Sequence, residues 1–370
     1  MRHRPKYLPI AILVISGIAS SCLFQSGENP NKRSISDGCG RSVNLPDTVR
    51  SVIALKAGAL RLLCYMDQAD KAGYIEGNEK RRSAPYLSAN PGLRELSIIG
   101  AGNNHDTELL AASNADLIIV TFMTCSEADK LQELTKKPVF VLNYGNLDDK
   151  TDDLFTSLKL LGKIFYREER ADSVIDYIRS TLSGGRYRTS DYNTDPVTAY
   201  IGGVAFSGSH GISSTVPGYP PFKAISAGNV AESLTKILDS SGSSQSNTVL
   251  VIDTEQLIKW DPEYIFLDAS GKEIWQKEVE KPVINETLKA FQNSKVYTVL
   301  PFNWYTINYE NLLCNMWFIG KTLYPETFTD INTEAKCREI YRFFYGTDVF
   351  DEMNDLYNPY KPVINAERNK

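Results

Sequence analysis

The chain has 370 residues and a formal net charge of −5, with 40 Lys and Arg against 45 Asp and Glu. An acidic chain without a basic run lacks the charge pattern of a nucleic-acid-binding protein, so no nucleic-acid partner is expected. Hydrophobic residues make up 42% of the sequence and aromatic residues 11%, which is enough apolar material for two hydrophobic cores.

The first 21 residues have the pattern of a secretory signal peptide. Arg2, Arg4 and Lys6 precede an uncharged apolar run, which ends in small residues just before Cys22. The run is too short to span a bilayer comfortably. Its end resembles the cleavage site of bacterial lipoproteins, although Ala19 stands where that site usually has Leu, Val or Ile. The resemblance implies lipidation of Cys22, and the alternative is ordinary signal cleavage in which Cys22 takes no part.

The next segments predict a tether and a first lobe. Residues 22–36 are mainly polar, with few apolar side chains, which is typical of a flexible tether carrying the lipid. Residues 37–150 then predict an N-terminal lobe, in which a turn-rich hairpin leads into buried strands near residues 51–55, 72–75, 117–120 and 139–142. Because helical or loop sequence separates these strands, we expect an α/β fold with mainly parallel sheets flanked by helices.

The middle of the chain predicts one long helix. Between residues 151 and 182, apolar side chains recur at helical spacing, acids stand at the start, and Gly184 and Gly185 follow the end. At 1.5 Å per residue this helix is about 48 Å long, enough to connect two lobes. Residues 183–358 predict a C-terminal lobe with final helices, and residues 359–370 predict a tail. The expected strands and helices of this lobe are at residues 198–201, 265–267, 296–300, 308–322 and 334–344.

Two segments of the sequence resemble each other without a gap. TELLAASNADLIIV at residues 107–120 returns as TEQLIKWDPEYIFL at residues 254–267, about one domain length later. Each copy begins with a capping Thr and an acid, continues as a short helix, turns, and ends in a buried strand. Repetition at this spacing predicts two equivalent lobes and not a solenoid.

An N-terminal motif adds a family resemblance. It consists of Asp37, Gly40, Arg41, Val43 and Pro46. Together with the following strand, the paired Thr-Glu segments and the connecting helix, it resembles the helical-backbone (class III) substrate-binding proteins of ABC importers. Proteins of this family deliver ferric siderophores, haem and cobalamin. The resemblance covers residues 36–350.

The resemblance implies two lobes with a ligand cleft between them and no enzymatic activity. It implies as partners an ABC permease dimer with its ATPase. The signal peptide and Cys22 imply a location in the periplasm or at the cell exterior, with a lipid anchor to the membrane. In the family, the acid of each repeated segment docks to an arginine of the permease, which implies this role for Glu108 and Glu255. The alternative is that both acids only stabilise helix N-termini, by about 0.3 to 1 kcal/mol each.

The candidate ligand-binding residues follow predicted strands. In open parallel sheets, ligands bind beyond the carboxyl ends of the strands. The candidates are Glu76, Arg81, Arg82, His105, Phe122 and Tyr144 in the first lobe and Phe206, His210, Tyr219, Phe222, Trp304 and Tyr305 in the second. The rings suit a large, flat, partly apolar ligand, and the two arginines suit an anionic one. The alternatives are a local apolar cluster for the rings and plain solvation for the arginines.

The two histidines that remain after signal removal are the candidate ligands for a metal. His105 and His210 are expected in cleft loops of opposite lobes, where they can ligate iron or cobalt or donate hydrogen bonds to a chelator. Ordinary surface histidines are the alternative. Two histidines are too few for the His-rich sites of related proteins that bind free zinc or manganese. We therefore expect no intrinsic cofactor and a bound iron or cobalt chelate.

Other features leave rival functions open or weaken them. Cys39, Cys64, Cys125, Cys314 and Cys337 are an odd set without CxxC spacing, which predicts neither a zinc site nor a disulfide framework. A binding protein for a free transition metal ion is one alternative function. An exported hydrolase is another, because GVAFSGSHG places serines beside a histidine, yet the stretch does not match GxSxG and no nucleotide-binding motif occurs.

Overall fold

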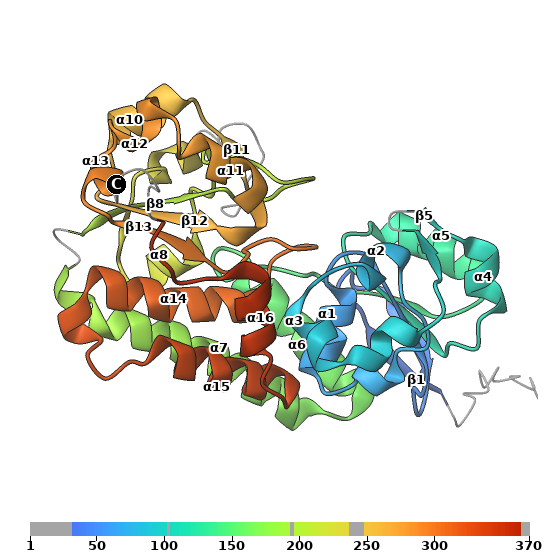
Figure 1. The fold of residues 1–370 in the computed structure, drawn as a ribbon. Coiled ribbons are helices and arrows are strands. Elements are labelled where there is room, and N and C mark those ends of the chain that lie inside the picture. The colour runs from blue at the N-terminus through green and yellow to red at the C-terminus, as the bar shows by residue number, and fades with distance from the viewer. Residues whose placement is uncertain (1–31, 102–103, 193–195, 237–247, 364–370) are drawn as a thin grey trace, which may run out of the picture.

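A computed structural model of the protein describes residues 32–101, 104–192, 196–236 and 248–363. Two α/β lobes lie side by side, and a layer of helices runs beneath one of them and reaches the other (Figure 1). The predicted fold class is confirmed. Within the described ranges, none of the helices combines the length and the apolar composition that crossing a membrane requires.

The N-terminal lobe is built on a parallel sheet with strand order β3-β6-β7. Its strands are β3 (Val52–Leu55), β6 (Leu117–Val120) and β7 (Val139–Val141), and an antiparallel hairpin of β1 (Lys32–Ser36) and β2 (Ser42–Pro46) precedes them. The remaining elements are α1 (Ala59–Tyr65), α2 (Gly77–Lys80), α3 (Pro85–Ala89), β4 (Gly100–Ala101), β5 (Asn104–His105), α4 (Thr107–Ala112) and α5 (Cys125–Thr135).

The C-terminal lobe repeats this plan with the parallel order β10-β8-β12-β13. The strands are β8 (Thr198–Gly202), β10 (Gly228–Asn229), β12 (Tyr264–Asp268) and β13 (Val296–Val299), and β9 (Ser214–Thr215) pairs with β11 (Leu250–Val251) at one side. Its shorter helices are α8 (Pro220–Ala224), α10 (Thr254–Trp260), α11 (Lys272–Glu278), α12 (Pro282–Asn285) and α13 (Lys289–Gln292).

The repeated segments occupy equivalent places in the two lobes. α4 leads into β6, which lies between β3 and β7, and α10 leads into β12, which lies between β8 and β13. Both strands are apolar because helices cover both faces of each sheet. The predicted cap residue is wrong by one position, since Asp106 caps α4 by accepting from the backbone N–H groups of Glu108 and Leu109 at 3.0 and 3.1 Å.

Alternate residues of these strands belong to different cores. Leu117 and Ile119 of β6 face a large core that extends from the N-terminal lobe through the helix layer into the C-terminal lobe, whereas Ile118 and Val120 face a smaller outer core. The helix layer consists of α6 (Thr151–Phe165), α7 (Glu168–Arg188), α14 (Tyr309–Leu323), α15 (Thr333–Tyr345) and α16 (Phe350–Tyr357). This shared core joins the lobes into one packed body.

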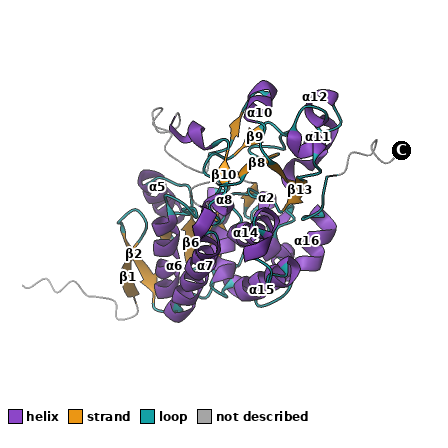
Figure 2. Ribbon diagram, turned by 90° about the vertical axis from the view of Figure 1, so that its left-hand side faces the viewer, coloured by secondary structure: helices purple, strands orange, loops and turns teal. Residues whose placement is uncertain are grey.

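The prediction of one helix over residues 151–182 is wrong, because two helices occupy the segment. Tyr166 adopts the left-handed conformation (φ 54°), and the backbone N–H of Arg167 donates to the carbonyl of Gly162 at 2.8 Å. α7 then folds back along α6, so that the guanidinium of Arg179 lies 4.7 Å from the ring centroid of Phe155 (Figure 2). Two acids open α7, where a helix N-terminus favours negative charge.

Of the two helices, α7 is the one that extends from one lobe to the other. Near its start, Arg170 donates to the carbonyl of Tyr65 in the N-terminal lobe at 2.9 Å. Near its end, Gly185 packs against Met316 and Ile225, where a Cβ atom would come within 2.9 Å of the Met316 sulfur. Its 21 residues correspond to a length of about 31 Å.

Three other expectations are corrected. Residues 32–36 belong to β1 and not to a flexible tether; the signal peptide, Cys22 and the rest of the tether lie outside the described residues. The predicted tail begins with residues 360–363 alongside β13, where Tyr360 N–H donates to the Thr298 carbonyl at 2.8 Å and covers a sheet edge. No strand forms at residues 72–75, because Ala72 and Ile75 pair with different partners.

The cysteine spacing indicated no disulfide framework and left open whether any pair is bonded, and one pair is bonded among the described residues. Cys39, in the turn between β1 and β2, is bonded to Cys125 at the start of α5, with their Cα atoms 5.7 Å apart. The two cysteines are 86 residues apart in sequence, so their spacing gave no indication that they pair. Cys64, Cys314 and Cys337 are free thiols in the core.

Candidate ligand-binding cleft

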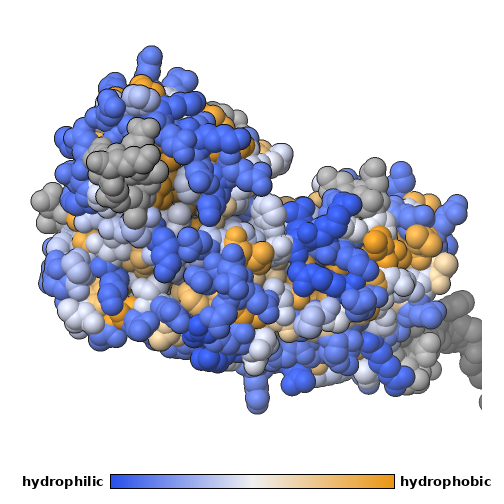
Figure 3. Space-filling model, viewed as in Figure 1, coloured by the Kyte–Doolittle hydropathy of each residue, from blue (hydrophilic) through white to orange (hydrophobic). Residues whose placement is uncertain are grey.

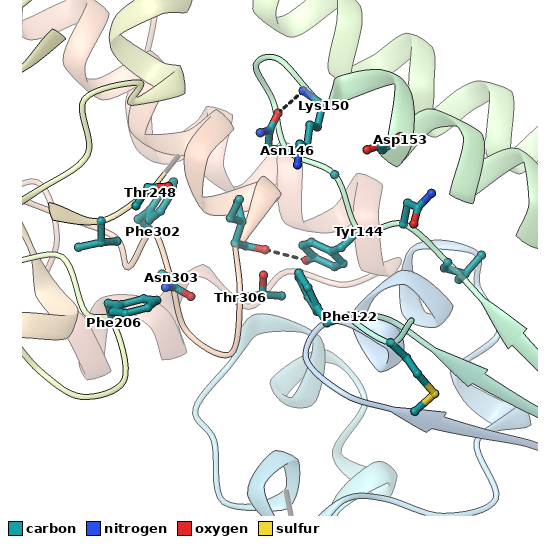
Figure 4. Close-up of a pocket in the computed structure, with 16 residues that line it drawn as sticks. Phe122, Tyr144, Asn146, Lys150, Asp153, Phe206, Thr248, Phe302, Asn303 and Thr306 are labelled. Atoms are coloured by element: carbon teal, nitrogen blue, oxygen red, sulfur yellow. Dashed lines mark hydrogen bonds between the residues drawn. The ribbon is translucent and has the colours of Figure 1, made fainter. Parts of the chain in front are cut away.

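A continuous cleft lies between the lobes. Its main chamber has a volume of about 760 Å³, and an adjoining chamber has about 610 Å³. Both chambers are lined by Phe122 of the N-terminal lobe and by Phe206, Asn303 and Thr306 of the C-terminal lobe (Figure 4). A space-filling view shows the molecule hollowed between its two lobes (Figure 3).

The lining residues come from loops at the carboxyl ends of the parallel strands, as such sheets predict. Lys56 follows β3, Phe122 follows β6 and Tyr144 follows β7 in the N-terminal lobe. Phe206 follows β8 and Asn303 follows β13 in the C-terminal lobe. The equivalent ends of the two sheets therefore face one space.

The wall from the N-terminal lobe pairs an exposed ring with a buried one. Phe122 is 61% exposed and adopts φ 47°, and its ring centroid lies 5.9 Å from that of Tyr144. The Tyr144 hydroxyl donates to the carbonyl of Ile307 across the cleft floor at 2.7 Å (Figure 4). Gly58 makes room for this ring, because a Cβ atom there would lie 2.1 Å from it and the φ of +87° suits glycine.

The opposite wall is a pair of loops held by one buried acid. Phe206 is 56% exposed. Asp268, at the end of β12, accepts from the backbone N–H of Phe302 at 2.6 Å and from the backbone N–H of Ser270 at 2.8 Å. Ser270 Oγ in turn accepts from the backbone N–H of Ala205 at 3.2 Å. Burial raises the pKa of Asp268 to about 7, against these hydrogen bonds, which lower it.

Positive side chains outnumber negative ones in the cleft lining, where Asp153 is the acid among the lining residues. Lys56, Arg82 and Lys150 line the cleft, and within the described part of the chain their side chains contact no carboxylate at ion-pair distance. The Arg82 guanidinium stacks 4.1 Å from the ring centroid of Tyr305. The neighbouring Glu76 is buried and already accepts from the Tyr305 hydroxyl at 2.9 Å and from Lys56 N–H at 3.0 Å. Burial raises the pKa of Glu76, against these hydrogen bonds and the charges of Lys56 and Arg82, which lower it.

Half of the predicted ligand-binding residues meet in the cleft. The lining members of that set are Arg82, Phe122, Tyr144, Phe206, Trp304 and Tyr305. Glu76 lies behind the lining and supports Tyr305. Arg81 is exposed outside the cleft and donates to Asn78 at 2.7 Å.

The prediction that Tyr219 and Phe222 line the cleft is wrong, because both belong to the hydrophobic core. Both are at most 1% exposed, and their ring centroids lie 5.0 Å apart in an edge-on contact. The Tyr219 hydroxyl accepts from Asn315 at 3.1 Å, so its polar group is satisfied inside the C-terminal lobe. The loop that carries them packs back onto its own sheet, which sequence alone did not distinguish from a cleft loop.

Neither histidine lines the cleft. His105 is partly buried beside Lys56. Burial lowers the pKa of His105, and the positive charge of Lys56 lowers it further. His210 Nε2 contacts the carbonyl of Phe206 at 2.6 Å and so braces the Phe206 loop. Ser209 Oγ donates instead to the carbonyl of Ser270, which leaves serine and histidine unpaired with each other. No group of three or more His, Cys, Asp or Glu suited to a metal ion occurs among the described residues.

Several polar residues of the cleft were missed by the sequence reasoning. They are Asn143, Asn146, Lys150, Asp153 and Asn303. All but the last follow β7 or begin α6, at the end of the predicted N-terminal lobe and the start of the predicted long helix. Their only signal is position after a strand, because polar residues at a helix start are equally typical of solvent exposure.

Comparison with known proteins fixes the family. Residues 78–301, more than half of the chain, match the model of the periplasmic binding proteins. The chain belongs to this family. The resemblance derived from the N-terminal motif and the paired segments is thereby confirmed, and this periplasmic binding protein is an extracytoplasmic solute-binding protein of an ABC importer.

Relatives of this periplasmic binding protein bind different solutes. The molybdate-binding protein MolA of Haemophilus influenzae is 22% identical over 90% of this chain and 96% of its own. MolA bound to molybdate has a similar structure, with a TM-score of 0.68 at 19% identity over 89% of this chain and 99% of that one. The siderophore-binding protein BauB, bound to two acinetobactin molecules and ferric iron, has a TM-score of 0.58 at 18% identity over 80% and 99%. Identities this low establish a shared fold only.

Proposed function

We propose that this protein captures an anionic metal chelate of the ferric-siderophore kind and delivers it to an ABC importer. The shape and charge of the cleft carry the proposal. Its chambers of about 760 and 610 Å³ suit an organic ligand of several hundred daltons, far larger than a bare ion. The exposed rings of Phe122 and Phe206 offer apolar surface to a chelator, and Lys56 and Arg82 offer charge to its anionic groups.

Calorimetric titration with defined chelates tests the proposal. The mature protein is titrated with ferric catecholate and ferric hydroxamate siderophores, haem and a corrinoid, with each metal-free chelator and with free ferric, zinc and nickel ions as controls. At least one iron or cobalt chelate is expected to bind at micromolar concentration or tighter, and the free ions are not. Binding of free zinc or nickel alone contradicts the proposal.

Molybdate is a second candidate ligand, favoured by a specific observation besides the MolA relationship. Trp304 Nε1 and Arg82 Nε are buried and have no hydrogen-bond partner among the described residues. Such donors suit the oxygens of a small oxyanion. The same titration with molybdate and tungstate distinguishes the candidates, because tight oxyanion binding without chelate binding replaces the first proposal with the second.

Delivery requires contact with the permease, for which we propose Glu108 and Glu255. Both are exposed, and each lies in the first turn of the helix before the central strand of its lobe. α4 and α10 lie on the periphery of opposite lobes, away from α7 and α15 (Figure 1). Two equivalent acids on two lobes match a permease built of two related halves.

A lipid anchor on Cys22 is proposed from the sequence. Intact-mass measurement of the membrane fraction is expected to show a mature chain beginning at Cys22 and carrying acyl groups. The Cys22→Ser variant is expected to move to the soluble fraction. An unmodified mature chain in the soluble fraction of the wild type contradicts the anchor and supports ordinary signal cleavage.

A further inference from the structure

A buried arginine of one lobe holds the ligand loop of the other. Arg61 lies in α1 of the N-terminal lobe and is fully buried. Residues 303–308 of the C-terminal lobe, here called the cleft loop, supply most of the hydrogen-bond acceptors of Arg61. Its Nη1 donates to the carbonyl of Ile307 at 2.7 Å, and its Nη2 donates to the carbonyl of Trp304 at 3.1 Å and to Asn308 Oδ1 at 2.6 Å.

Arg61 has no direct carboxylate partner among the described residues. Two buried acids, Glu79 and Glu310, have other partners. Glu79 accepts from the Tyr86 hydroxyl, and Glu310 accepts from the Tyr65 hydroxyl. Its guanidinium carbon lies 5.0 Å from the ring centroid of Tyr86. Three oxygens of the cleft loop, together with the Tyr144 hydroxyl, are therefore the groups that directly accept from this buried charge. A buried charge without such partners is strongly unfavourable.

The cleft loop needs an external restraint. Tyr305 and Thr306 adopt φ values of 58° and 68°, a region that residues other than glycine sparsely occupy and that a β-branched residue rarely adopts. The oxygens that Arg61 binds come from the residues directly flanking these two. Arg61 thus fixes both sides of the turn that presents Trp304 and Tyr305 to the cleft.

Tyr144 and Tyr309 extend the same connection. The Tyr144 hydroxyl accepts from Arg61 Nη1 at 2.5 Å. It also donates to the Ile307 carbonyl, as Figure 4 shows. The Tyr309 hydroxyl returns a bond to the Tyr144 carbonyl at 2.7 Å, and the two rings stack with centroids 5.0 Å apart. The cleft loop therefore bonds to the N-terminal lobe at several points although it belongs to the C-terminal lobe.

We infer that Arg61 is a positioning residue, which lines no part of the cleft itself but holds the cleft loop in its binding geometry before the ligand arrives. Fixing the loop in advance removes an ordering cost that the ligand would otherwise meet on binding. The inference rests on the proposed function only for the identity of the ligand. Loop order in the ligand-free protein tests it separately.

The experiment compares Arg61→Met and Arg61→Lys with the wild type, each labelled with 5-fluorotryptophan and assigned through Trp304→Phe. Fluorine NMR of the ligand-free variants is expected to show the Trp304 resonance broadened or split, because the loop samples several conformations. Affinity for the ferric siderophore that binds the wild type is expected to fall about tenfold or more, with Arg61→Lys intermediate because lysine lacks the guanidinium fork.

The matched control is Arg338→Met, which removes another multiply bonded arginine whose partners Glu334, Asp348 and Asp351 lie outside the cleft. This control is expected to leave the Trp304 resonance and the affinity unchanged. An unaltered, single Trp304 resonance in a folded Arg61 variant overturns the inference, whatever ligand binds. If both Arg61 variants fail to fold, Tyr144→Phe decides, since it removes only the hydroxyl shared with Arg61; an unchanged Trp304 resonance there overturns the inference equally.

Discussion

Two buried acids lie immediately behind the cleft, and the pKa of each is raised. Glu79 accepts from the Tyr86 hydroxyl in the N-terminal lobe, and Asp268 anchors the Phe302 backbone in the C-terminal lobe. Burial raises the pKa of each carboxyl group to about 7. Because the folded protein favours their protonated forms more than the unfolded chain does, both groups stabilise the fold at low pH and lose that contribution as pH rises.

Glu79 gives a testable pH dependence of stability. Its pKa rises from an ordinary 4.5 to about 7, so its contribution is complete below pH 4.5 and is lost as pH rises through 7. The free energy of unfolding of the wild type should therefore fall between pH 5 and 8, by at most about 1.4 kcal/mol per pH unit for this group. Glu79→Gln should reduce this slope in urea denaturation, whereas the exposed Glu133→Gln should not. Equal slopes in both variants would mean that Glu79 titrates normally.

Adjacent arginines provide a matched test of cleft charge. Arg82 lines the cleft and stacks on Tyr305, while Arg81 is exposed outside it. A hydrogen bond to a charged group contributes about 1.5 to 3 kcal/mol, so Arg82→Gln should weaken binding of the anionic chelate about 10- to 100-fold. Arg81→Gln should change it less than about twofold. Titration calorimetry at two salt concentrations checks both, and equal losses would place the ligand elsewhere.

At the scale of elements, local periodicity located the strands but not the turn between helices. β6 and β12 were predicted within one or two residues because four consecutive apolar residues bounded by polar turns have few other interpretations. The break at Tyr166 escaped prediction because apolar spacing continues on both sides of it. Close packing of Glu168 and Ala171 against Gly162 accompanies that turn, and a contact of this kind does not change the periodicity of the apolar residues.

The cleft was predicted in part for the same reason. Strand ends identified the loops that carry Phe122 and Trp304, since parallel strands all end on one edge. Sequence did not reveal which rings of a long loop turn inward, as the burial of Tyr219 and Phe222 illustrates. Arg61 gave no signal at all, because a lone arginine in an apolar helix is indistinguishable in sequence from one that extends to solvent.

The turn between α6 and α7 is open to a direct test. A Cβ atom on Gly162 would lie 3.1 Å from the Cβ of Ala171 and 3.1 Å from the Cα of Glu168. Gly162→Val should therefore destabilise the protein by about 1 to 3 kcal/mol in urea denaturation. Gly184→Ala is the control on the connecting helix, because its new Cβ would meet only Trp317 at 3.6 Å. That variant should be neutral or stabilise by up to about 1 kcal/mol, and the opposite order of effects would refute the folded-back geometry.

At the scale of the whole molecule, the two lobes are connected by more than a linker. α7 spans them, one hydrophobic core runs through both, and Lys223 of α8 forms an ion pair with Asp148 before α6. Arg61 adds bonds between the cleft loop and the opposite lobe. Large hinge closure would break these buried contacts, so ligand recognition should proceed with modest movement of the lobes. A nearly rigid body keeps Glu108 and Glu255, the two peripheral acids proposed for docking, at a constant separation.

Because that separation is constant, docking to the permease and binding of the ligand can be tested independently. Glu108→Lys and Glu255→Lys should abolish uptake of the chelate in cells or in reconstituted vesicles while affinity in solution stays within about twofold, because neither acid lines the cleft. Asp152→Lys is the matched control, since it reverses an exposed acid in the first turn of α6 and loses the same interaction with a helix N-terminus. If the acids served only to stabilise helices, all three variants would transport equally well. Loss of affinity in the Glu108 or Glu255 variant would instead mean that these acids contact the ligand.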